Sequence, residues 1–338
     1  MSTFDESKVN RQKDGKFGFK SAGDPVAGLS FDKQVSSRDV HLATDAQRWE
    51  YIEHSKPSVR ADVAHYGNDK HRRALIDDPE WIVRVSIAKH GNEEARWQLI
   101  HDENMFVRAD VAQYGTDEQR QTLVNDKEPH VRASVARYGN ESQREQLIDD
   151  ENKDVRYAVA MSGSESQRER LINDPEGHVR MSVANFGNDS QRERLIDDPY
   201  SGVRMGVARE GTHAQRERLI NDSDSQVRMI VAQNGTDQQR QALINDESDV
   251  VRCAVAWNGT TEQANLLADD PSPRVRQGAV RKCDTATTRK LANDPSSIVR
   301  LSVVDTTHDR AILAFLSADE DPIVSHEAQN RLNNESFS

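Results

Sequence analysis

Apolar and polar positions follow one pattern that returns along most of the chain. Between Ser166 and Asp189, a Gln-Arg pair is followed by Leu-Ile, Asp, Val-Arg, Val-Ala and Gly, with polar residues between them. The Val-Arg pair occurs eleven times from Val59 to Val299, always at a spacing of 24 residues. Such self-similarity at a fixed period is typical of proteins that stack one supersecondary unit on the next.

The first half of each period predicts a short helix. Val179, the Val-Ala pair after it and Phe186 recur at helical spacing, so they share one apolar face. We expect Asp174 to be the N-cap and Pro175 to occupy the first helical position. We expect Gly187 to end the helix because glycine takes the left-handed conformation without steric cost. The aromatic position at the end of this helix is predicted to lie in the core, at Tyr66, Tyr114, Tyr138 and Phe186.

The second half of each period predicts a second helix. Asn188 with Gln191 forms a capping-box pattern, and equivalent pairs stand in neighbouring repeats. Leu195-Ile196 and its equivalents supply the apolar side, and the Arg after each Gln is expected to cover the core edge with its methylene stem. Helices this short are not stable alone, so each repeat must bury its apolar face on its neighbours.

The pattern therefore predicts an all-α fold, a right-handed α-solenoid of about eleven 24-residue two-helix repeats with degenerate terminal caps. Regular repeats span about residues 55–310 and the C-terminal cap is decayed, within a repeat domain of residues 35–338. Residues 1–34 are polar and lack a helical period, which predicts a disordered N-terminal tail.

Composition narrows the function classes. The formal net charge of −12 disfavours nucleic-acid phosphate as a partner, although local binding through arginines remains possible. The two cysteines, Cys253 and Cys283, cannot build a disulfide framework. No apolar run is long enough to span a membrane, and the first residues have no apolar core typical of a secretory signal. We therefore expect a cytoplasmic protein with no membrane partner.

The 24-residue repeat resembles the repeats of two related families. The segment DPEGHVRMSVANFG, residues 174–187, is similar to HEAT-like repeats, and the 24-residue period is similar to that of leucine-rich-repeat-variant proteins. The resemblance implies a helical stack that binds other macromolecules, although a few such solenoids are enzymes. One type of leucine-rich-repeat variant carries an iron–sulfur cluster on an N-terminal cysteine group. This chain has no cysteine before Cys253, so we expect no cofactor.

An Asp stands six residues before the Arg of the Val-Arg pair in ten repeats. Resemblance to HEAT-like repeats implies that these residues pair along the stack. A basic ladder that grips phosphates is the alternative. The predicted structural ladder comprises Asp78, Arg84, Asp102, Arg108, Asp126, Arg132, Asp150, Arg156, Asp174, Arg180, Asp198, Arg204, Asp222, Arg228, Asp246 and Arg252.

A second set of residues lies about 200° around the first helix from the central valine, at ~100° per residue. These positions hold large apolar side chains in successive repeats, which suits a protein or peptide partner. The alternative is that neighbouring first helices bury them. The candidate partner-binding residues are Tyr157, Met181, Met205 and Met229 at these positions, with Met161 and Trp257 nearby, six residues after the valine of their repeats.

Motifs for catalysis or metal binding are missing from the sequence. It contains no HExxH, GxSxG, P-loop or GxGxxG before a helix, so we assign no catalytic, cofactor-binding or metal residue. The leading hypothesis is a non-catalytic scaffold or adaptor that binds a protein or peptide partner. The alternatives are DNA or RNA binding through arginines, acidic DNA mimicry, and a HEAT-like DNA glycosylase or lyase, for which Trp81, Trp97 and Trp257 are the aromatics of interest.

Overall fold

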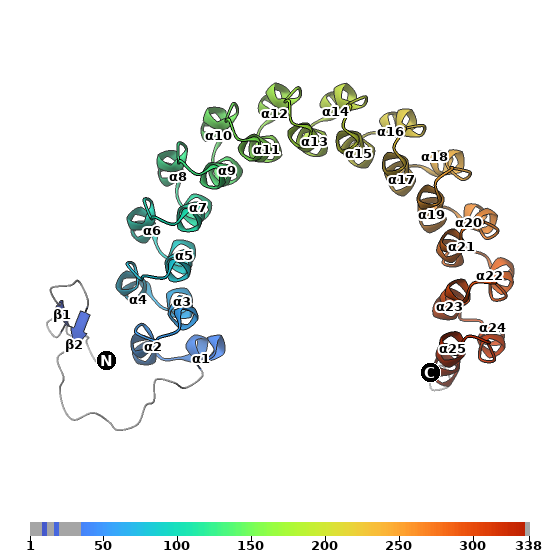
Figure 1. Ribbon diagram of the computed structural model, residues 1–338, viewed down its shortest axis with the longest axis horizontal. Helices are drawn as coiled ribbons and strands as arrows, with labels where there is room; N and C mark the ends of the chain where they lie inside the picture. The colour runs from blue at the N-terminus through green and yellow to red at the C-terminus, as the bar shows by residue number, and fades with distance from the viewer. Residues whose placement is uncertain (1–8, 12–16, 20–34, 335–338) are drawn as a thin grey trace. The chain divides into compact units, whose positions relative to one another are not determined.

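The computed structural model describes residues 9–11, 17–19 and 35–334. Contacts between residues divide the chain into two compact units, Met1–Leu99 (unit 1) and Ile100–Ser338 (unit 2). Over the described ranges the chain forms 25 helices and one pair of three-residue strands. The all-α solenoid predicted from the sequence is confirmed in both units (Figure 1).

Unit 1 contains the strand pair and six helices. Strands β1 (Val9–Arg11) and β2 (Phe17–Phe19) are antiparallel, with Val9 opposite Phe19. This pairing differs from the prediction of a tail without structure over residues 1–34; the rest of that segment lies outside the described residues. The helices are α1 (Ser37–Leu42), α2 (Asp45–Tyr51), α3 (Pro57–Tyr66), α4 (Asp69–Ala74), α5 (Trp81–His90) and α6 (Glu93–Leu99).

Unit 2 contains two rows of helices. The first-helix row consists of α7 (Met105–Tyr114), α9 (Pro129–Tyr138), α11 (Lys153–Ser162), α13 (Gly177–Phe186), α15 (Ser201–Glu210), α17 (Ser225–Asn234), α19 (Asp249–Asn258), α21 (Pro273–Val280), α23 (Ser297–Thr306) and α25 (Pro322–Asn334). The second-helix row consists of α8 (Asp117–Leu123), α10 (Glu141–Leu147), α12 (Glu165–Leu171), α14 (Asp189–Leu195), α16 (His213–Leu219), α18 (Asp237–Ala242), α20 (Thr261–Leu267), α22 (Thr285–Leu291) and α24 (Arg310–Leu316).

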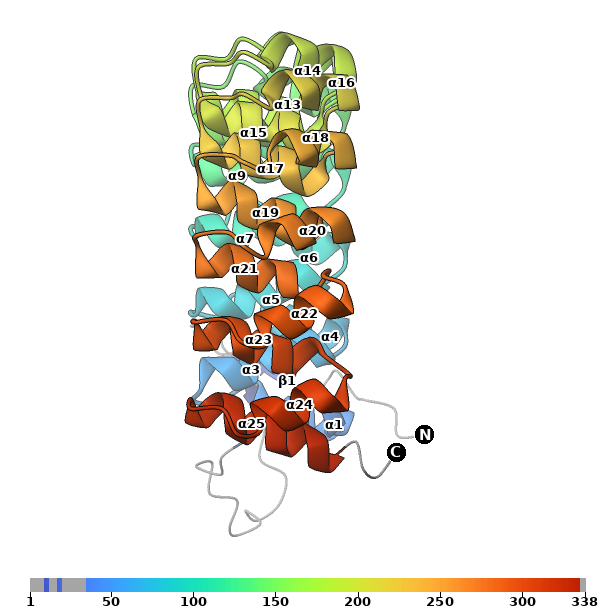
Figure 2. The ribbon, with the colours of Figure 1, turned by 90° about the vertical axis from the view of Figure 1, so that its right-hand side faces the viewer.

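Within unit 2, each first helix packs against the next first helix along the chain. The first-helix row lies on the concave side of this unit (Figure 1). Figure 2 shows α19, α21 and α23 one above the next, with α20 and α22 beside them. The contacts are therefore made between neighbouring repeats, as stacking requires.

The core of each repeat comes from the positions that the periodicity selected. Val179 and Val183 on α13 are fully buried, as is Ala184. Leu195 and Ile196 at the end of α14 are buried against them. Since the same five positions are buried in successive repeats, apolar burial is the main force that holds the stack together.

The first helices begin later than predicted. Helix α13 begins at Gly177 with Glu176 as its N-cap, so Asp174 is not the cap and Pro175 is not the first helical residue. The carboxylate of Asp174 instead accepts a hydrogen bond from the backbone N–H of Glu176 at 2.9 Å. It thereby orders the turn between two repeats, because an Asp side chain readily bonds to the backbone two residues on.

The glycine at the end of each first helix does not take the left-handed conformation. Gly187 has φ −78° and ψ 179°, an extended backbone that any residue adopts. A Cβ at Gly187 would lie 2.5 Å from the carbonyl oxygen of Val183 and 2.5 Å from Oε1 of Gln191. The prediction of a left-handed cap is therefore wrong. Glycine is needed here because a Cβ would overlap the neighbouring oxygen atoms.

The aromatic residues that end the first helices are not core residues. Tyr114, Tyr138 and Phe186 are 42%, 38% and 47% exposed, and Tyr66 is half-buried. Each is the last residue of its helix. At that place the ring extends past the part of the apolar face that neighbouring helices cover, so the prediction of a core position is wrong.

Candidate binding surface

The arginine of each Val-Arg pair is held between two repeats. Nε and Nη2 of Arg180 bond to the two carboxylate oxygens of Asp198, at 2.6 and 2.8 Å, and Nη1 donates to the carbonyl oxygen of Asp174 at 2.7 Å. The aspartate six residues earlier thus supplies its carbonyl, while its carboxylate binds the arginine of the preceding repeat, Arg156. A planar guanidinium matches a carboxylate in this bidentate geometry.

The same contact recurs along unit 2, and we call it the arginine–aspartate ladder. Its pairs are Arg108–Asp126, Arg132–Asp150, Arg156–Asp174, Arg180–Asp198, Arg204–Asp222, Arg228–Asp246, Arg252–Asp270, Arg276–Asp294 and Arg300–Asp319. These arginine side chains are only 6–14% exposed. Their donors are already engaged, which leaves little capacity to bind phosphate.

The predicted ladder residues of unit 1 make related contacts. Asp78 binds the guanidinium of Arg60 through both carboxylate oxygens, and Arg84 donates from Nη1 to the carbonyl of Asp78 at 2.7 Å. Asp102, at the start of unit 2, accepts from the N–H of Asn104 at 2.8 Å. In both units the aspartate orders the turn before a first helix.

The ladder shifts the pKa of its carboxylates. Burial by itself raises the pKa of Asp126, but the Arg108 guanidinium and the backbone N–H of Glu128 outweigh that effect and lower the pKa below its ordinary value. The pKa values of Asp150 and Asp246 are lowered in the same way by Arg132 and Arg228. The folded chain therefore favours the charged carboxylate at these positions.

The Gln-Arg pair joins its own helix to the first helix of the same repeat and to the preceding repeat. Gln191 is buried; its Oε1 accepts from the N–H of Asn188 and completes the predicted capping box, and its Nε2 donates to the carbonyl of Glu165 in the preceding repeat at 2.9 Å. Nε of Arg192 donates to the carbonyl of Ala184 at the end of the first helix. The recurrence of Gln at this place in the repeat was the available signal for the contact between repeats.

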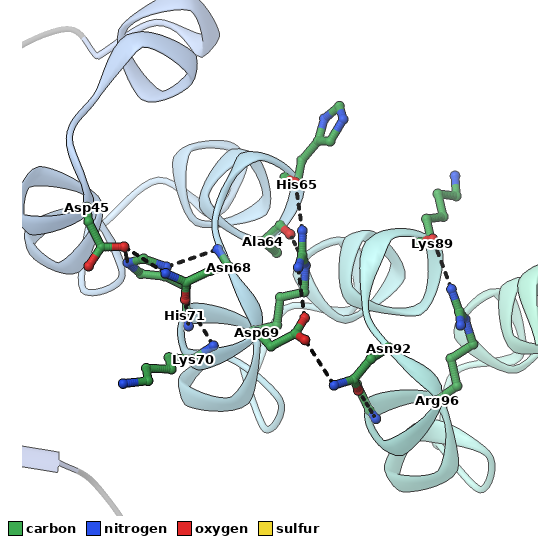
Figure 3. A network of polar contacts seen from close by, with 12 residues as sticks. Asp45, Ala64, His65, Asn68, Asp69, Lys70, His71, Lys89, Asn92 and Arg96 are labelled. Atoms are coloured by element: carbon green, nitrogen blue, oxygen red, sulfur yellow. Dashed lines mark hydrogen bonds and ion pairs between the residues drawn. The ribbon is translucent and has the colours of Figure 1, made fainter. Parts of the chain in front are cut away.

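Unit 1 keeps the capping contact of this arrangement with another residue (Figure 3). His71 stands in place of the glutamine, and its Nδ1 accepts from the N–H of Asn68 at 3.2 Å. Burial lowers the pKa of His71, so the neutral ring is favoured. A nearby hollow between Asp69 and Asn92 has a volume of only about 20 Å³, room for one water molecule. We therefore assign this network a structural role.

The predicted partner-binding residues all lie on first helices of unit 2. Tyr157, Met181, Met205 and Met229 are half-buried between neighbouring first helices, as is Met161 on the last turn of α11. Trp257 on α19 is 43% exposed. The methionines are therefore less exposed than the sequence prediction of a position opposite the buried face requires.

The structure brings these residues together in two hollows. The first, the α11–α13 hollow, has a volume of about 240 Å³ and is lined by Lys153, Asp154, Tyr157, His178, Val179 and Met181. The second, the α17–α21 hollow, has a volume of about 280 Å³ and is lined by Met229, Gln233, Asp249, Val250, Cys253, Ala254, Trp257, Asn258 and Arg274. Met161 and Met205 line neither of these two hollows.

Trp257 is fixed by the next repeat. A Cβ added at Gly278 of α21 would lie 2.8 Å from Cδ1 and Nε1 of the Trp257 ring, so the ring rests directly against the α21 backbone. The guanidinium carbon of Arg281, which belongs to the same repeat as Gly278, lies 4.9 Å from the centroid of the Trp257 ring. These contacts orient the tryptophan before any partner arrives.

The cysteines are poorly suited to chemistry. Burial raises the pKa of the Cys253 thiol, and burial raises that of Cys283 to about 12. Both thiols are therefore protonated near neutral pH, and both are free. Among the residues that the structure describes, no group of three or more His, Cys, Asp or Glu side chains could hold a metal ion. No helix in the described ranges combines the length and apolarity needed to cross a membrane.

Comparison with known proteins gives a match at the level of structure. No family model matches this sequence, and no curated protein matches it. A solved leucine-rich repeat variant, described as having a novel repetitive structural motif, aligns with a TM-score of 0.54 and 26% identity, covering 62% of this chain and 88% of that one. The chain is a helical-repeat solenoid.

Two other solved structures align to this solenoid less well. An engineered protein aligns with a TM-score of 0.29 and 15% identity, covering 89% of this chain and 99% of its own. A designed armadillo repeat protein in complex with the peptide (KR)4 aligns with a TM-score of 0.10 and 17% identity, covering 88% and 100%. Superpositions this loose carry no argument about function, which must come from the surface of the solenoid.

Proposed function

We propose that this protein is a non-catalytic binding scaffold that holds an extended protein or peptide segment against the first-helix row of unit 2. The observation that carries the proposal is the pair of apolar hollows between first helices. Apart from the buried Val179 and Ala254, their lining residues lie outside the arginine–aspartate ladder and outside the buried aliphatic positions that stack the repeats. They can therefore vary without loss of the fold.

The size of the hollows favours side chains of a macromolecule as occupants. Pockets for small molecules usually exceed about 300 Å³. The two hollows, at about 240 and 280 Å³, lie below that range but can each hold a large side chain. A few apolar anchors surrounded by a polar rim are the usual source of affinity in protein interfaces.

The structure also bears on the nucleic-acid alternatives. Direct DNA or RNA binding by the Val-Arg arginines is disfavoured because their guanidinium groups bond to aspartates. Mimicry of DNA by the aspartates of the ladder is disfavoured because the same ion pairs neutralise them. We keep a cytoplasmic location, which the cysteine content suggested, as part of the proposal.

A selection from a random peptide library against the immobilised full chain tests the proposal. We expect recovered peptides to lose binding to a chain that carries Tyr157→Ala and Trp257→Ala. Leu266 on α20 is 62% exposed and belongs to the second-helix row, so Leu266→Ala is a matched control that should leave binding unchanged.

Two outcomes would overturn the proposal. One is a selection that recovers no specific peptide. The other is a set of peptides that bind the Tyr157→Ala, Trp257→Ala chain as tightly as the original chain but lose binding to the Leu266→Ala chain. The second result would place the binding surface on the second-helix row.

A further inference from the structure

Three cationic residues lie on or directly after α21, the helix that contributes Arg274 to the α17–α21 hollow. Arg274 lies on α21, and Arg281 and Lys282 follow directly after that helix. All three are exposed, and none forms an ion pair with any residue in the described part of the chain. In a chain with a net charge of −12, such a group is a local exception.

Two of these residues lie beside the hollow or its tryptophan. Arg274 lines the hollow itself, where its carbonyl oxygen lies 3.7 Å from Sγ of Cys253. Arg281 lies over the Trp257 ring with its guanidinium carbon 4.9 Å from the centroid. One arginine thus lines the hollow, and a second lies over the tryptophan that lines it.

The charges that line the two hollows differ. Lys153 and Asp154 balance one another in the α11–α13 hollow. In the α17–α21 hollow the lining carboxylate is Asp249, which accepts a hydrogen bond from Oγ of Ser272 at 3.2 Å. Arg274 offsets its charge within the lining, and Arg281 adds a further positive charge over Trp257.

We infer that the α17–α21 hollow takes an apolar side chain from a peptide segment that carries carboxylates next to that side chain, and that Arg274 and Arg281 bind those carboxylates. The inference rests on the proposed function and names the chemistry of its partner. Guanidinium groups bind carboxylates through charge-assisted hydrogen bonds, and a neighbouring apolar anchor excludes water from them.

The same peptide selection, sorted by dependence on Trp257, tests this inference. Among peptides that lose binding to the Trp257→Ala chain, we expect Asp or Glu beside an aromatic or aliphatic residue far more often than Lys or Arg. In the most enriched peptide, replacement of Asp and Glu by Asn and Gln should weaken binding about fivefold to tenfold, measured by fluorescence anisotropy at low ionic strength.

Substitutions in the full chain test whether Arg274 and Arg281 cause the preference for acidic peptides. Arg274→Gln together with Arg281→Gln should remove the difference between the acidic peptide and its amide counterpart, whereas Arg274→Lys with Arg281→Lys should keep most of it. Arg137 on α9 and Arg209 on α15 occupy the same place in their repeats as Arg281 and are exposed. Arg137→Gln and Arg209→Gln are therefore matched controls that should leave the preference intact.

The outcomes separate this inference from the proposed function. Trp257-dependent peptides without acidic residues, or an acidic preference that survives Arg274→Gln with Arg281→Gln, would overturn the inference while the scaffold stands. A selection that yields no specific peptide would overturn the scaffold and the inference together. An acidic preference lost only in the Arg274 and Arg281 variants would support both.

Discussion

Arg276 and Arg281 are five residues apart and belong to different regions of the molecule. Arg276 is part of the arginine–aspartate ladder, with its guanidinium bonded to both carboxylate oxygens of Asp294. Arg281 is exposed, forms no ion pair with a described residue and lies over Trp257. The first arginine occupies a position that every repeat needs, and the second occupies one that each repeat is free to change.

The difference between the two regions teaches how a repeat can separate stability from recognition. Ladder positions and buried aliphatic positions keep the same residue types because each satisfies a contact with the next repeat. The lining of the hollows changes from repeat to repeat, from Tyr157 and Met181 to Met229 and Trp257. Substitutions in the ladder should therefore affect folding, and substitutions in the hollows should affect binding.

The largest effect is expected where the ladder is broken. Asp246→Ala removes the bidentate partner of Arg228 and the acceptor for the N–H of Ser248. We expect the free energy of unfolding to fall by about 3 kcal/mol, because a largely buried guanidinium loses its carboxylate. Urea unfolding followed by circular dichroism measures the change.

Asp249→Ala is the matched control for this substitution. Asp249 carries the same charge three residues further on, but in the described part of the chain its carboxylate accepts a single side-chain hydrogen bond, from the hydroxyl of Ser272. Its loss should change the free energy of unfolding by less than about 1 kcal/mol. Equal losses for Asp246→Ala and Asp249→Ala would contradict the separation of the two regions.

A smaller loss is expected at the end of the first helix. Gly187→Ala should reduce the free energy of unfolding by about 2 kcal/mol because its Cβ would overlap the carbonyl oxygen of Val183. Gly187→Asn should be at least as harmful, measured in the same way. An Asn variant much more stable than the Ala variant would instead indicate a left-handed backbone, which Asn tolerates better.

Acid should weaken the ladder without any substitution. The pKa values of Asp126, Asp150 and Asp246 are lowered in the folded chain, whereas the unfolded chain titrates near the ordinary value of about 3.9. The unfolded state therefore binds more protons in acid, and stability that is fully present above this value is lost as the pH falls below it. Urea midpoints measured across this range should fall, and a flat profile would count against the ladder.

The largest effect on binding is expected in the hollow, with a smaller effect on folding than in the ladder. Trp257→Ala should lower the free energy of unfolding by about 2 kcal/mol, because the side chain is 43% exposed and only its buried part contributes. The same substitution should weaken a selected peptide more than tenfold, since an apolar anchor is lost. Isothermal titration calorimetry measures the affinity and urea unfolding measures the stability of the same preparation. A large loss of stability with unchanged affinity would contradict a binding role for Trp257.

Sequence alone was sufficient for the features that depend on periodicity. The spacing of Val179 and its partners predicted the stacked helix pairs, and the pairing of Asn188 with Gln191 predicted the capping box. Both signals are local, because a helix fixes which residues three or four positions apart meet. The repeat number and the fold class followed from them.

Features that depend on backbone torsion or on the next repeat could not be predicted. The sequence places Asp174 six residues before Arg180, but only the fold shows that its carboxylate binds Arg156, 18 residues earlier. Gly187 is compatible with either a left-handed or an extended backbone until neighbouring atoms are placed. The hollows likewise require two or three repeats in contact, as with Trp257 against Gly278.

The most direct test of the central claim is the alkylation rate of Cys253 with and without a selected peptide that depends on Trp257 for binding. Cys253 lines the α17–α21 hollow, whereas Cys283 packs against the C-terminal core and serves as an internal control. Peptide mapping by mass spectrometry should show Cys253 alkylated several-fold more slowly when the peptide saturates the chain, and Cys283 unchanged. An unchanged rate at Cys253 under saturation would contradict the claim that partners bind in this hollow.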